Sequence, residues 1–209
     1  MEAAVLINEL FWATRGSHYI SDIVKIDLRQ KTGESNSFTN KSASLSLSYV
    51  PINSFNISLS GSISSNNQEL QYVSTKYSGN GNNSLPRYVN ANLDQDTFNL
   101  SLRLNYTITP ELTIQYYGSP FISRGRYTNF KYITNSLASK FTDRFQQYNN
   151  NQITYNSASD SYLVDENVDA TTDYSISNPD FSFIQFQSNL VARWEYIPGS
   201  EIFLVWSQG

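Results

Sequence analysis

An acidic stretch in the last quarter of the chain has the side-chain spacing of a calcium loop. Within residues 165–173 (DENVDATTD), oxygen-bearing side chains recur at every second position. Asp165, Asn167, Asp169 and Asp173 would supply side-chain oxygens, and Thr171 a backbone carbonyl. The spacing predicts a structural calcium ion that orders a long loop. The alternative is a solvated acidic surface loop.

Two positions depart from that pattern. The sixth is Ala170, where the sharp turn favours glycine, and the twelfth is Ile176, where a bidentate glutamate is usual. Another group, with Asp180 as the candidate, would have to complete the coordination shell. Calcium is the one cofactor that the sequence suggests, and we expect no other.

The remaining reactive side chains do not assemble into a catalytic set. Asp94 and Asp96 would share one face of a strand, as a glycosidase pair might require, but two solvated residues at a strand edge explain them better. His18 is the single histidine, and no serine stands in a G-x-S-x-G context. We therefore predict that the chain is not an enzyme.

The composition narrows the class of protein. The chain has 209 residues, no cysteine, 15 % charged and 14 % aromatic residues, and a net charge of −4. The acidic balance argues against a nucleic-acid partner, since phosphate binding needs a basic surface. No apolar run reaches the ~18 residues of a membrane-spanning helix. The first residues do not resemble a secretory signal, so any export signal would lie upstream.

Alternation of apolar and polar residues is the strongest pattern in the chain. It is clearest at 42–49, 55–63, 98–107 and 184–196. Successive side chains of a strand point to opposite faces, so each run predicts a strand with one apolar and one polar face. The prediction is an all-β, antiparallel up-and-down meander of about eight strands. The expected strands span residues 2–13, 18–29, 38–50, 55–77, 87–107, 112–132, 183–197 and 201–208.

The links between these strands alternate in length. Short links are expected at 14–17, 51–54, 109–111 and 198–200, and long ones at 30–41, 78–86 and 133–182. In a meander, alternate links emerge at the same end of the sheet, so short turns gather at one rim and long loops at the other. Bacterial outer-membrane barrels are built in this way, which makes 133–182 an expected extracellular loop.

The two faces fit a membrane barrel better than a soluble antiparallel sheet, which would alternate as well. Aromatic residues expected at the membrane interface lie beside the short turns, and the apolar faces carry almost no charge, with Asp22 as the exception. The interface residues are Tyr49, Tyr106, Trp194 and Tyr196. Arg103, Arg193 and Glu195 would face the lumen, where they either line a path or pair to fill it. Tyr116, Tyr117 and Phe121 offer a sugar-stacking platform or ordinary packing.

Several segments resemble one known family. They are similar to the C-terminal barrel domain of large outer-membrane proteins of unknown function, in which the barrel follows a domain similar to family 9 carbohydrate-binding modules. The resemblance is specific from about residue 87 to residue 208. The segments are RYV at 87–89, LDQ at 93–95, LSLRLN at 100–105, QYYGSPFIS at 115–123, NPDF at 178–181, SNLVARWEYIPGS at 188–200 and FLVWSQ at 203–208.

The residue pattern and the resemblance together give an expected location and function. We expect residues 1–209 to be one barrel segment, truncated at both ends, in the bacterial outer membrane with lipid as its partner. Its role would be transport or surface display. One alternative is glycan binding or utilisation with an upstream carbohydrate-binding domain that this chain lacks, and another is a soluble β-sandwich binding module.

Overall fold

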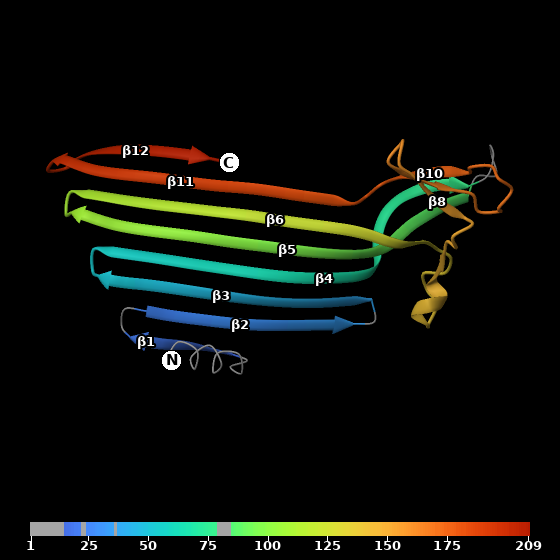
Figure 1. The fold of residues 1–209 in the computed structure, drawn as a ribbon, viewed down its shortest axis with the longest axis horizontal. Helices are drawn as coiled ribbons and strands as arrows, with labels where there is room; N and C mark the ends of the chain where they lie inside the picture. The colour runs from blue at the N-terminus through green and yellow to red at the C-terminus, as the bar shows by residue number, and fades with distance from the viewer. Residues whose placement is uncertain (1–14, 22–23, 36, 79–84) are drawn as a thin grey trace.

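The chain folds as a broad antiparallel sheet with a small second sheet at one end (Figure 1). The computed structural model describes residues 15–21, 24–35, 37–78 and 85–209. In sequence order, neighbouring strands of the main sheet pair side by side as a meander. Its strands are β1 (Arg15–Ser21), β2 (Val24–Ser35), β3 (Phe38–Ile52), β4 (Phe55–Ser78), β5 (Leu85–Thr109), β6 (Leu112–Ile133), β11 (Phe181–Ile197) and β12 (Ser200–Gln208).

The connection between β6 and β11 contains structure of its own. It begins with a 3-10 helix, η2 (Phe141–Arg144), and with β7 (Phe145–Gln147), which pairs with β6. The strands β8 (Ile153–Asn156), β9 (Ser161–Val164) and β10 (Tyr174–Ser177) then form the three-stranded second sheet. The segment 133–182, predicted as a long loop, is therefore largely ordered by short strands.

The predicted all-β meander is confirmed. Each expected strand from 38–50 onward matches an observed strand to within a few residues. Tight turns at 53–54, 110–111 and 198–199 gather at the left end of the sheet in Figure 1. The turn between β11 and β12 uses Gly199 at a φ of 79°, a conformation that glycine adopts without steric cost.

The N-terminal part of the prediction was wrong in two places. Residues 18–29 form parts of two strands, because β1 pairs with β2 in a hairpin that joins Ser21 to Val24. A two-residue link by itself would shift the alternation, but the register shift between Tyr19 and Ser21 offsets it. Even-numbered residues therefore keep to one face on both strands, and the pattern conceals the reversal. The predicted short link at 14–17 lies mostly within β1, which also contains His18. The predicted strand at 2–13 and the exception Asp22 lie outside the described residues.

The predicted long link at 30–41 was also wrong. Most of its residues extend β2 and β3, which pair up to Ser35 and Phe38. Polar residues on both faces hid this extension, because a strand without an apolar face has no visible period of two.

The buried hydrophobic core is small and lies where the second sheet meets the main one. Apolar side chains of β5 and β6 pack there against the β6–β11 connection, and β10 contacts β4. The rings of Phe130 and Tyr162 stack with their centroids 4.5 Å apart. The core residues are Val89, Ala91, Phe130, Tyr148, Val164 and Ile176.

A close contact fixes β11 against β6. Gly125 of β6 pairs with Phe181 of β11, whose ring lies over the glycine. A Cβ atom on Gly125 would lie 2.2 Å from a ring carbon of Phe181. At Gly61 in β4, by contrast, an added Cβ atom would lie 3.4 Å from Leu100, which is an ordinary contact. The ring therefore covers a site where no side chain fits.

We expect Gly125→Ala to lower the free energy of unfolding by about 1–3 kcal/mol, because the added methyl group displaces the Phe181 ring. Gly61→Ala is the matched control and should change it by less than about 1 kcal/mol. Urea unfolding measures both, and combination with Phe181→Ala should reduce the cost of Gly125→Ala. Equal losses at the two glycines would contradict the close contact.

Candidate functional site

One face of the main sheet is apolar across all the described strands from β3 to β12. Residues paired across antiparallel strands point to the same face. Following the pairs from strand to strand therefore gives rows of side chains that lie side by side on that face. One row joins Tyr49, Ile57, Leu104, Tyr116, Leu190 and Trp206, and another joins Ala43, Ile63, Phe98, Ile122 and Ile184. We call this surface the apolar face.

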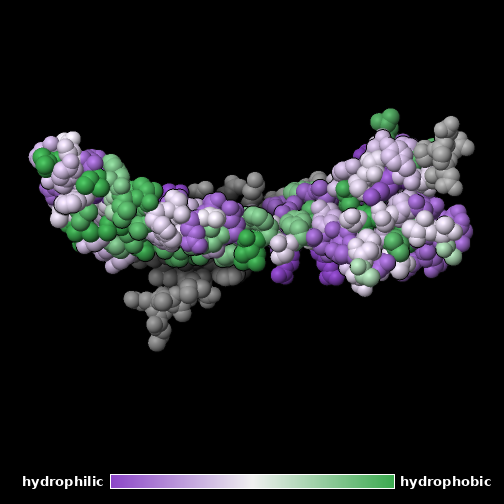
Figure 2. Space-filling view, turned by 90° about the horizontal axis from the view of Figure 1, so that it is seen from above, coloured by the Kyte–Doolittle hydropathy of each residue, from purple (hydrophilic) through white to green (hydrophobic). Residues whose placement is uncertain are grey.

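Little of the described part of the chain covers the apolar face. Ile184 is 73 % exposed, Leu204 67 % and Trp206 52 %. Seen from above (Figure 2), hydrophobic residues gather over the part that carries β11 and β12. Hydrophilic residues dominate the end that carries the second sheet. Contiguous apolar surface of this extent marks an interaction site, because monomeric soluble proteins rarely expose it.

The apolar face has a defined height, by which we mean the length of each strand over which its apolar residues continue. Its side chains run from Phe55 to Ile63 in β4, from Phe98 to Tyr106 in β5 and from Leu112 to Ile122 in β6. Each run covers about 9–11 residues, the length with which a tilted strand crosses the hydrocarbon core of a bilayer. The strands themselves are longer, at 24, 25 and 22 residues.

Charged residues replace the apolar ones immediately beyond that run. On the same face, the next row joins Lys41, Ser65, Asp96 and Arg124. The row after it pairs Asp94 with Arg126, and Asn67 donates a hydrogen bond to Asp94. The boundary between apolar and charged rows crosses four strands at one level. Asp94 and Asp96 share one face, as predicted, and belong to this charged boundary.

The four predicted interface aromatics lie on the apolar face near the tight turns. Tyr49 pairs with Ile57, and the ring of Tyr106 meets that of Phe55 edge-on at 5.6 Å. Trp194 and Tyr196 lie 6.1 Å apart between ring centroids, and about half of each side chain is exposed. Amphipathic rings at the end of an apolar surface are typical of a membrane interface.

The opposite face is polar over β3, β4 and β5. Serines pair across β3 and β4, with 2.9 Å between the Oγ atoms of Ser46 and Ser60 and 3.3 Å between those of Ser48 and Ser58. We call this surface the polar face. Toward β11 and β12 it gains apolar side chains, among them Phe183, Val191 and Val205.

The predicted lumen residues all lie on the polar face. Arg103 stacks over the ring of Tyr117 at 4.9 Å. Arg193 forms an ion pair with Glu201 of β12 at 2.5 Å. Glu195 instead accepts a hydrogen bond from the backbone N–H of Gly199 at 2.8 Å, which closes the turn.

The structure does not assemble the predicted sugar platform. Tyr116 and Tyr117 are neighbours in β6 and therefore point to opposite faces. Phe121 shares the polar face with Tyr117, where its ring meets that of Phe183 at 6.0 Å. The three rings cannot stack on one ligand.

The residues of the acidic loop bond mainly to the loop itself. Carboxylate oxygens of Asp165 accept from the backbone N–H groups of Asp169 and Ala170, and Asp173 accepts from that of Glu166. The Asn167 amide donates to Asp169 at 2.9 Å. In the described part of the chain, three or more His, Asp or Glu side chains nowhere gather as metal ligands would. The calcium site stays a prediction.

A polar cluster that the sequence did not indicate joins the second sheet to β5. Arg87 donates three hydrogen bonds to Glu166, from Nε to Oε1 at 2.9 Å and to Oε2 at 3.1 Å, and from Nη2 to Oε2 at 2.9 Å. Tyr174 donates to the same carboxylate at 2.6 Å, and Ser78 donates at 3.1 Å. Arg87 and Glu166 lie far apart in the sequence, so no local pattern of residues predicts their contact.

The electrostatics of this cluster favour ionised Glu166. Burial alone would raise the pKa of Glu166, but the hydrogen bonds from Arg87 and Tyr174 outweigh it and hold the pKa below its usual value. Burial, together with the hydrogen bond to Glu166, raises the pKa of Tyr174 far above its ordinary range. The cluster therefore carries one ion pair and neutral tyrosines at neutral pH.

Another cation, this one buried, lies nearby in β6. Lys131 is 3 % exposed, and its ammonium group donates to the carbonyl of Glu69 at 2.9 Å and to Asn92 at 2.6 Å. It also lies 4.6 Å from the centre of the Phe145 ring. Burial lowers the pKa of Lys131. Its contacts tie β4, β5 and β7 together, which indicates a structural role.

Comparison with protein-family models, with curated proteins and with solved structures gives no match to this chain. The resemblance to the outer-membrane family therefore stays a prediction. Across the described residues, no helix is long and apolar enough to cross a membrane.

We expect Glu166→Gln to weaken the attachment of the second sheet by about 1–3 kcal/mol, because Arg87 loses its charged acceptor. Since the pKa of Glu166 is lowered in the folded chain, the stabilisation is complete above its unfolded pKa. It is lost as the pH falls through the lower, folded value. Hydrogen exchange of residues 153–177 between about pH 3 and pH 7 measures both effects.

The exposed turn residue Glu111 provides the matched control, and Glu111→Gln should leave that exchange unchanged. A second sheet that exchanges equally fast in wild type and in Glu166→Gln at neutral pH would contradict the role of the ion pair.

Proposed function

We propose that this chain forms part of the wall of a β-barrel in the bacterial outer membrane. The apolar face would contact lipid and the polar face would line the lumen. The observation that carries the proposal is the height of the apolar face, about 9–11 residues per strand, with charged rows at one end and aromatic residues at the other.

The opposite arrangement of short and long links supports the same proposal. The tight turns lie at one end of the sheet, and the link from β6 to β11 lies at the other (Figure 1). Outer-membrane barrels place tight turns in the periplasm and long connections outside the cell. The connection that holds β8, β9 and β10 would then be displayed at the cell surface.

The role that fits this arrangement is passive. The polar face would enclose a hydrated lumen, and the folded connection would be held outside by strands that continue beyond the membrane. Display of the second sheet is favoured by two features, the ion pair and the buried core, which attach that sheet firmly to β5 and β6. A role in glycan utilisation rests on the resemblance alone.

Site-directed spin labelling tests the membrane contact directly. The chain contains no cysteine, so single cysteines placed along 98–106 can carry a nitroxide without background. We expect even-numbered positions to be accessible to oxygen, which dissolves in lipid, and odd-numbered ones to a water-soluble nickel complex. The full chain reconstituted in phospholipid vesicles is the sample.

Asp94 and Asp96 are the internal controls, because they share the face of Phe98 but lie beyond the apolar run. Labels there should be accessible to nickel. If even-numbered positions in 98–106 prove inaccessible to both reagents, protein covers the apolar face, and the soluble β-sandwich alternative replaces the barrel.

A charge on the apolar face should be costly only if lipid covers that face. Leu102 lies midway between Phe98 and Tyr106, so Leu102→Arg should lower the free energy of unfolding in vesicles by about 2–4 kcal/mol. Its neighbour Ser101 points to the polar face, and Ser101→Arg should cost less than about 1 kcal/mol. Urea unfolding in vesicles measures the difference, and similar costs at both positions would contradict the assignment of faces.

A further inference from the structure

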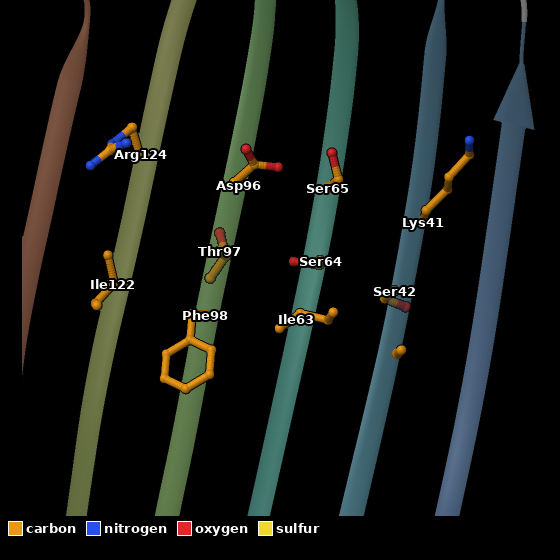
Figure 3. A pocket seen from close by; sticks show the side chains of 11 residues that line it. Lys41, Ser42, Ile63, Ser64, Ser65, Asp96, Thr97, Phe98, Ile122 and Arg124 are labelled. Carbon is orange, nitrogen blue, oxygen red and sulfur yellow. The ribbon is translucent and has the colours of Figure 1, made fainter. Parts of the chain in front are cut away.

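A pocket lies across the boundary between the apolar and charged rows (Figure 3). Its volume is about 570 Å³, and it spans β3, β4, β5 and β6. Its floor is apolar, with Ile63, Phe98 and Ile122 in one row. Its upper edge carries Lys41, Ser65, Asp96 and Arg124, which Figure 3 shows side by side on four successive strands.

The cations of this pocket are available to a ligand. Lys41 and Arg124 are exposed, and within the described part of the chain neither is held by a hydrogen bond or an ion pair. Asp96 is exposed, and its backbone pairs with that of Arg124 on the neighbouring strand. The two side chains form no salt bridge. Two unpaired cations beside an apolar floor match an amphiphile with an anionic headgroup.

The distance between the two cations limits which kinds of headgroup fit the pocket. Lys41 and Arg124 are separated by three strand-to-strand steps of about 4.8 Å each, or roughly 14 Å across the sheet. A single phosphate cannot meet both cations without both side chains leaning inward over Asp96. Between them, the Ser65 hydroxyl and the Asp96 carboxylate offer hydrogen-bond partners for hydroxyl groups. The order across the pocket is therefore cation, hydroxyl, carboxylate and cation.

We infer that this pocket binds a glycolipid headgroup that carries two phosphates, with an acyl chain lying on the apolar floor. One phosphate meets Lys41 and the other Arg124, and sugar hydroxyls between them donate to Asp96. The inference rests on the proposed function, because the pocket lies on the face assigned to lipid. It places this lipid at the end of the apolar face away from the tight turns, which is the outer leaflet in the proposed orientation.

Native mass spectrometry of the full chain in a non-ionic detergent tests the inference. Diphosphoryl lipid A, monophosphoryl lipid A and phosphatidylglycerol are added separately at equal concentrations. A cation near a membrane surface contributes about 1 kcal/mol toward an anionic lipid, which corresponds to about fivefold in affinity. We therefore expect diphosphoryl lipid A to bind about fivefold more tightly than the monophosphoryl form.

Charge-removing variants locate the site. Of Lys41→Gln and Arg124→Gln, the variant that removes the partner of the phosphate missing from monophosphoryl lipid A should bring the two forms to equal affinity, and the other should weaken both forms. Lys76→Gln and Lys140→Gln remove the same charge outside the pocket and should keep the preference. Preference retained in both variants of the first pair, or lost in the second pair, would overturn the assignment.

Further outcomes distinguish a failure of the glycolipid site from a failure of the proposed function. If excess inorganic phosphate at matched ionic strength removes the lipid adducts, the pocket is a phosphate site that does not use the acyl chain, and the inference falls. If the spin-label scan shows the period-two lipid contact but all three lipids bind equally, the glycolipid site falls and the barrel stands. If the scan also fails, the proposed function falls with it.

Discussion

Hydrogen bonding between neighbouring backbones is the constraint on which this structure depends. It fixes the register of each strand against the next, and the register decides which side chains share a face. Ile63 pairs with Phe98, which in turn pairs with Ile122. A slip of one residue would place Ser62 or Ser64 beside Phe98 and mix the two faces along the whole sheet.

Two kinds of apolar surface result from this register. At the end of the sheet near β8, β9 and β10, apolar side chains are buried by the chain itself, and Val89 and Val164 are fully enclosed. Over the rest of the sheet, none of the described residues forms a layer against the apolar face. The first surface stabilises the chain internally, whereas the second is the one that the proposed function assigns to a bilayer of matching thickness.

The strands and faces of the sheet from β3 onward were predictable because each strand crosses the apolar run with a strict alternation, as Phe98 to Tyr106 does. The reversal between β1 and β2 was not, since the register shift beside the turn lets the alternation continue from one strand into the next. The short strands β8, β9 and β10 have four residues each, too few to establish a period. The Arg87–Glu166 ion pair joins residues 79 positions apart, so only the folded chain reveals it.

The continuation of β4, β5 and β6 past the charged rows has a mechanical consequence. These strands continue from the apolar run to the second sheet, and the link between the two parts is a hydrogen-bonded ladder with register shifts at 68–74 of β4 and 90–92 of β5. Force applied to the second sheet would pass through Glu166 and Arg87 into β5, and through Tyr148 and Phe130 into β6. A pull on the second sheet would therefore become a torque on the strands that carry the apolar face.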